Sequence, residues 1–154
     1  MSHERDENGC YGPVIGKPIK NGQPLYRHYY KPQAYHNRTA ASRNQKEKWI
    51  VGEGEQFSYF KIADENEVSP RWLCNSNSCL FSIGNNGRDV LGGKSERLAK
   101  FKIPQNELDP WHGYPVTTTD HEPWNTPSNE LLDLWVKHNV INSTTRRRIE
   151  RAKL

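Results

Sequence analysis

The 154-residue chain lacks the features that define several classes of protein. No apolar run approaches the roughly 20 residues that a membrane-crossing helix needs. The N-terminal stretch MSHERDENGCYG contains no apolar segment typical of a secretory signal, so we expect a cytoplasmic protein with no membrane partner. Cysteines are few and odd in number (Cys10, Cys74 and Cys79), which excludes a disulfide framework as the basis of the fold.

Aliphatic residues are scarce in the first third of the chain. Residues 1–45 are polar and interrupted by glycine and proline, and such a segment buries too little apolar surface to offset its ordering entropy. We therefore predict a polar, basic arm over residues 1–45, mobile or loosely packed, and a single domain over residues 46–154.

Tyrosines are the exception in this arm, because they alternate there with basic residues. Rings beside cations suit stacking on bases and contact with phosphates, whereas the alternative is that the rings pack the arm onto the domain. The residues of this pattern that we assign to a nucleic-acid surface are Arg27, Tyr29, Tyr30, Lys31 and Arg38.

Charge is unevenly distributed along the chain, although the net charge is only +4. Residues 1–50 carry a charge of +5, residues 51–142 carry −5, and residues 143–154 carry +4. Basic ends can attract a polyanion, or they can simply neutralise the acidic middle.

Short runs of β-forming residues from Trp49 onward predict a small antiparallel sheet of four or five strands. The runs 48–51, 57–62 (FSYFKI) and 98–103 are predicted strands, and 71–74 and 79–83 are predicted to form a hairpin. The stretch DPWHGYPV, residues 109–116, is predicted to lie in a long loop after the last of these strands.

The C-terminal segment changes to a helical period, so we predict two helices that make a helical hairpin over residues 126–154. The run Thr126-Pro127-Ser128 is predicted to supply the cap of the first helix, with proline in its first turn, and Asn142-Ser143 is predicted to cap the second, so the overall class is α+β. The segment LLDLWVKHNVINSTTRRRIERAKL resembles a helix-turn-helix in outline, with Asn139 in the turn and Ser143 to Arg148 on the reading surface. It departs from that motif at Trp135, where a small residue is usual, and the alternative is an ordinary hairpin with solvated arginines. The basic residues expected to touch phosphate here are Arg146, Arg147, Arg148 and Arg151.

No metal or other cofactor is expected from the remaining patterns. Cys74 and Cys79 could supply half of a zinc site, but no second pair stands in register. The stretch Gly92–Ser95 (GGKS) lacks the upstream glycine that a phosphate-binding loop requires.

Histidines close to carboxylates suggest where catalysis would occur if the protein were an enzyme. A carboxylate that bonds to an imidazole fixes its tautomer and raises its basicity, which suits general acid–base chemistry. The candidates in this region are Asp109, His112, Asp120, His121 and Glu122.

Together these patterns favour a small protein that binds DNA or RNA through its basic ends and N-terminal tyrosines. A small hydrolase or nuclease that uses His112 or His121 is one alternative. A protein-interaction module, such as an inhibitor or accessory factor, is another.

Overall fold

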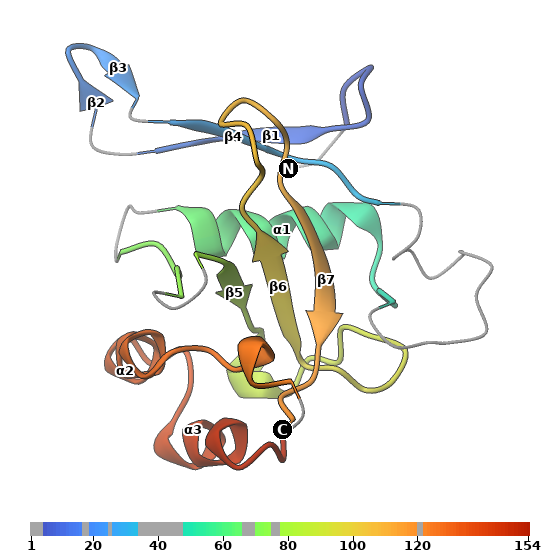
Figure 1. Cartoon of the computed structure of the whole chain (residues 1–154), viewed down its shortest axis with the longest axis vertical. Helices are drawn as coiled ribbons and strands as arrows, with labels where there is room; N and C mark the ends of the chain where they lie inside the picture. Colours follow the sequence, from blue (N-terminus) through green and yellow to red (C-terminus); the bar gives the residue numbers. More distant parts are fainter. Residues whose placement is uncertain are drawn as a thin grey trace.

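A three-stranded antiparallel sheet lies at the centre of the protein, with β6 between β5 and β7 (Figure 1). The computed structural model describes residues 5–16, 19–24, 26–33, 48–65, 70–74, 78–119 and 122–154. The strands are β5 (Leu80–Ser82), β6 (Leu98–Lys102) and β7 (His112–Val116). The class is α+β as predicted, but this sheet has fewer strands than the four or five expected. Residues 98–102 form a strand as predicted, whereas residues 48–51 contribute only an isolated bridge from Trp49 to Gly92.

The predicted hairpin over residues 71–83 forms only in part. Its second half contains β5, but its first half contributes a single bridge from Leu73 to Leu80. The turn is closed by the Cys74 N–H, which donates to the carbonyl of Cys79 at 2.7 Å.

The motif at residues 109–116 supplies a strand rather than the predicted loop. Its last five residues form β7, which pairs with β6 from Lys102 opposite His112 to Leu98 opposite Val116. The prolines in the motif favoured a loop, but β7 is an edge strand, where a residue without an N–H is tolerated. Gly113 is required here, because a Cβ atom on it would lie 2.1 Å from the Phe101 ring.

Helix α1 (Glu53–Asp64) covers one face of the sheet (Figure 1), and it replaces the strand predicted over residues 57–62. Its buried residues follow a helical period, which a short window of β-forming residues conceals; they are Gln56, Phe57, Phe60, Ala63 and Asp64. Phe60 makes an edge contact with Phe101 of β6, with ring centroids 5.4 Å apart. Burial against the sheet therefore outweighs the local β propensity.

Two hairpins form within the predicted N-terminal arm. Strand β1 (Tyr11–Ile15) pairs with β4 (Arg27–Tyr30), and β2 (Ile19–Lys20) pairs with β3 (Gln23–Pro24).

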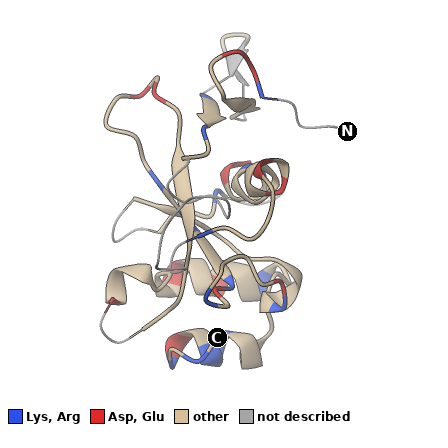
Figure 2. Ribbon diagram, turned by 90° about the vertical axis from the view of Figure 1, so that its right-hand side faces the viewer, with Lys and Arg blue, Asp and Glu red and all other residues tan. Residues whose placement is uncertain are grey.

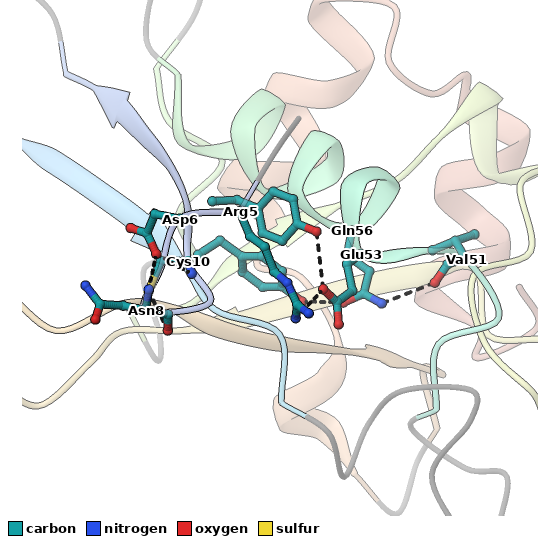
Figure 3. Close-up of polar contacts among 9 residues, drawn as sticks. Arg5, Asp6, Asn8, Cys10, Val51, Glu53 and Gln56 are labelled. Carbon is teal, nitrogen blue, oxygen red and sulfur yellow. Dashed lines mark hydrogen bonds and ion pairs between the residues drawn. The ribbon is translucent and has the colours of Figure 1, made fainter. Parts of the chain in front are cut away.

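The β1–β4 hairpin is tied to the first turn of α1, as Figure 3 shows around Glu53 and Gln56. Glu53 accepts hydrogen bonds from Arg5 and from the Tyr11 hydroxyl, each at 3.2 Å. The Tyr30 hydroxyl donates to Gln56 at 2.8 Å.

Two C-terminal helices follow the sheet, as the sequence predicted, but Pro127 precedes the cap of the first helix instead of lying in its first turn. Helix α2 (Asn129–Lys137) is capped by the Ser128 hydroxyl, and α3 (Ser143–Glu150) by the Asn142 side chain, which accepts from Thr145 N–H at 2.8 Å. Trp135 anchors α2 through an edge contact with Trp72, with ring centroids 5.5 Å apart. Among the described residues, no helix has the length and apolar character needed to span a membrane.

Candidate functional site

The C-terminal helix α3 has one buried side and one basic side. Thr145 and Ile149, four residues apart, face the interior. Arg147, Arg148 and Arg151 are exposed on the remaining surface. Figure 2 shows basic positions gathered on this helix and acidic positions on α1. We refer to Arg147, Arg148, Arg151 and the exposed Lys153 as the α3 basic surface.

The predicted arginines of this segment differ in how they are paired. Arg146 forms ion pairs with Asp133 of α2 and with Glu150, the latter at 3.7 Å. In the described part of the chain, no ion pair engages Arg147, Arg148 or Arg151. Arg148 instead donates to the backbone carbonyl of Lys153 at 3.2 Å. Three of the four predicted arginines are therefore available to an external anion.

The predicted N-terminal binding residues lie at the opposite end of the molecule. Figures 1 and 2 place the β1–β4 hairpin and α3 at opposite ends of the long axis. Arg27 and Lys31 are exposed and Tyr29 is half-buried, but Tyr30 is 0% exposed and its ring cannot stack on a base. Arg38 lies outside the described residues.

The candidate catalytic residues are not brought together around His112. Its Nδ1 donates to the backbone carbonyl of Lys31 at 2.8 Å, not to a carboxylate. Asp109 is exposed and accepts from Asn106, whereas Glu122 accepts from Asn125 beyond the far end of β7. Asp120 and His121 lie outside the described residues. The neighbouring Trp111 is 2% exposed and belongs to the core.

The structure does pair a histidine with a carboxylate elsewhere, at His28 and Asp64. Asp64, at the end of α1, is 0% exposed and accepts from His28 Nδ1 at 2.8 Å. Its other oxygen accepts from Arg71 Nε at 2.9 Å and Nη2 at 2.6 Å. Sequence reasoning missed this cluster, because its three members come from separate segments and no local spacing connects them.

Aromatic rings enclose the Asp64 cluster. The Arg71 guanidinium lies 4.8 Å from the centroid of the Tyr26 ring and 5.8 Å from that of Trp111. Burial, followed by the charge of Asp64, raises the pKa of Tyr26 to about 12. The Asp64 carboxylate is thus shared by an imidazole and a guanidinium, an arrangement that joins β4, α1 and the segment at residue 71.

A groove that no sequence pattern indicated adjoins the first turn of α3. Its main chamber has a volume of about 540 Å³ and lies between α1, the turn at residues 84–86 and the α2–α3 connection. A second chamber of about 410 Å³ shares Asn86 and Asn139 with the first and reaches Ser143 of α3. We refer to these two chambers as the asparagine groove.

The asparagine groove combines an apolar wall with a polar rim. The wall includes Ile62, Trp72, Ile83 and Val140. The rim includes Tyr59, Asn85, Asn86 and Asn139. The Tyr59 hydroxyl donates to Asp89 at 2.9 Å, and burial followed by this hydrogen bond raises the Tyr59 pKa.

The cysteines form no disulfide, and Cys74 and Cys79 are buried. Burial is the main cause that raises the pKa of Cys79, which disfavours the thiolate that binds metals. Among the described residues, no group of three or more His, Cys, Asp and Glu is arranged to hold a metal ion.

Comparisons of the chain with family models, curated proteins and solved structures give no match.

Proposed function

We propose that this protein binds nucleic acid and that the α3 basic surface contacts the phosphates. The observation that carries the proposal is the contrast within α3: Arg146 is neutralised by Asp133 and Glu150, whereas Arg147, Arg148 and Arg151 have no carboxylate partner among the described residues. Arginine suits this role because its planar guanidinium donates two parallel hydrogen bonds to a phosphate.

The salt dependence of the affinity for nucleic acid tests the proposal. Four phosphate contacts, one for each basic side chain of the surface, predict a slope of about −3 in log affinity against log salt for a single strand. Affinity should then fall roughly 50-fold between 50 and 200 mM salt. Fluorescence anisotropy of a labelled oligonucleotide measures both quantities.

Two variants with equal net charge distinguish binding by the α3 basic surface from attraction by the net charge of the protein. Arg147→Gln, Arg148→Gln and Arg151→Gln together lower the net charge from +4 to +1, and so do Lys94→Gln, Lys102→Gln and Lys137→Gln at exposed positions that belong to neither basic end. The α3 variant should lose about two units of the salt slope, while the control variant keeps it. Equal losses in both variants, or no binding by the unmodified protein at low salt, would exclude the proposed surface.

The two alternative functions receive less support from the described residues. A hydrolase that uses His112 lacks a carboxylate partner for that histidine within the described chain. A protein-interaction role is retained as the alternative if no nucleic acid binds.

A further inference from the structure

We infer that the asparagine groove takes one unpaired nucleobase of a strand whose phosphates contact the α3 basic surface. The inference rests on the proposed function and adds a substrate class to it, namely unpaired rather than duplex nucleic acid. Three observations support it: the chemistry of the groove, its asparagine backbone conformations and its position beside α3.

The walls of the groove match the two kinds of surface that a nucleobase presents. A base has apolar π faces and an edge of hydrogen-bond donors and acceptors, and single-strand readers place the faces on apolar or aromatic groups. The main chamber offers Ile62 and Trp72 to the faces and asparagine carboxamides to the edge. A carboxamide both donates and accepts, so it can pair with such an edge. A volume of about 540 Å³ also lies within the usual range for small-ligand pockets.

The three asparagines of the rim all have left-handed backbone conformations. Their φ values are 51° for Asn85, 56° for Asn86 and 59° for Asn139. Glycine is the default residue where a turn alone requires this conformation, so asparagine adds a carboxamide at a small conformational cost.

These carboxamides differ in their present partners. Asn86 Oδ1 accepts from the Asn142 N–H at 3.0 Å, which holds the groove against α3. Within the described residues, the Asn139 carboxamide has no hydrogen-bond partner and is exposed at the mouth of both chambers. Asn139 is therefore the residue best placed to read a base edge.

The groove continues directly onto the basic surface. Ser143 lines its second chamber, and Arg147 follows one helical turn later on α3, about 5.4 Å along the axis. Arg151 follows after a further turn. A strand that leaves a base in the groove thus meets a row of arginines with its backbone, whereas a paired base would have to be extracted first.

Two groove variants and two matched controls test the inference. Asn139→Gly removes the carboxamide and tolerates the φ of 59°, and its control is Asn21→Gly, where φ is 54° in the β2–β3 turn. Ile62→Ala shortens a wall residue that is 51% exposed, and its control is Ile103→Ala at 55% exposure. Each protein is titrated with a labelled single strand, with an abasic strand of the same length and with a duplex.

The expected result is that the unmodified protein binds the base-bearing strand more tightly than the abasic strand or the duplex. Ile62→Ala should weaken binding of the base-bearing strand about fivefold, because a stacked base contributes at least that much. Asn139→Gly should weaken it about two- to tenfold, because one hydrogen bond contributes that much. Affinity for the abasic strand should not change, and both controls should match the unmodified protein.

The outcomes distinguish this inference from the proposed function. If no strand binds at low salt, the proposed function fails. If all strands bind equally, or if the groove variants keep full affinity, the groove does not take a base although the α3 surface still binds phosphate. Because Ile62→Ala could affect folding, amide chemical-shift changes on titration with a mononucleotide give a second measurement, and shifts that spare Asn85 and Asn139 would overturn the inference.

Discussion

Replacement of Asp64 by alanine should destabilise the protein strongly, because the Arg71 guanidinium and the His28 ring would lose their shared hydrogen-bond acceptor. Asp64 has 0% side-chain exposure, whereas Arg71 has 25% and His28 has 12%. Removal of one partner from a buried ion pair typically costs about 3–5 kcal/mol. Water can reach part of the Arg71 guanidinium, so we expect the lower end, about 3 kcal/mol. That is a large share of the roughly 5–15 kcal/mol that stabilises a typical domain.

Urea unfolding followed by tryptophan fluorescence measures this loss, since Trp111 lies beside Arg71. The midpoint should fall without a change in slope, and Tm should fall by roughly 6–12 °C. Asp109→Ala is the control, because Asp109 is exposed and accepts only from Asn106; its effect should stay within about 0.5 kcal/mol. A loss below about 1 kcal/mol for Asp64→Ala would show that the cluster does not hold the hairpin to α1.

Two further predictions concern single residues. The phenol of Tyr26 should titrate at about 12 instead of the usual 10.0, which the difference in ultraviolet absorbance between the protein and its Tyr26→Phe variant measures. Because the folded-state pKa is raised, the contribution of Tyr26 to stability is complete below pH 10 and is lost between about 10 and 12; titration near 10 would contradict its burial. Gly113→Ala should cost about 1–3 kcal/mol through overpacking, because its Cβ would lie 2.1 Å from Phe101. Gly52→Ala, which meets no atom within 4 Å, should have a much smaller effect, and equal unfolding midpoints for the two variants would refute this reasoning.

Elements with local signals could be predicted from the sequence, and elements that depend on long-range burial could not. The runs Thr126-Pro127-Ser128 and Asn142-Ser143 indicated the starts of α2 and α3, because a cap acts on a backbone N–H only a few residues away. The segment FSYFKI has β-forming residues but lies in α1, since Phe60 packs against Phe101 of β6 and against Trp111, the residue before β7. Pro115 led to the prediction of a loop, whereas it lies in the edge strand β7. The sequence does not reveal which strand lies at the edge, because that position is a property of the whole sheet.

The same distinction applies to the candidate sites. The arginines of α3 could be identified as a basic cluster because they are adjacent in sequence, and only the structure separates Arg146 from the other three. Tyr30 looked like a stacking residue beside Lys31, but it is a core residue whose hydroxyl bonds to Gln56. The asparagine groove joins residues from α1, from the turn at residue 85 and from the α2–α3 connection, so no single window of sequence contains it.

The arrangement of charge along the long axis limits how a polyanion can bind. The basic residues of the β1–β4 hairpin and those of α3 lie at opposite ends, and α1 carries the acidic residues Glu53 and Glu55 between them (Figure 2). A strand held at α3 that extended towards the hairpin would approach these carboxylates, which disfavours contact with both ends at once. Binding at α3 alone gives a salt slope of about −3. If Arg27 and Lys31 also contact phosphates, the slope becomes steeper by more than one unit. The measured slope therefore reports whether the two basic ends act together, and a variant with Arg27→Gln and Lys31→Gln shows whether the hairpin contributes.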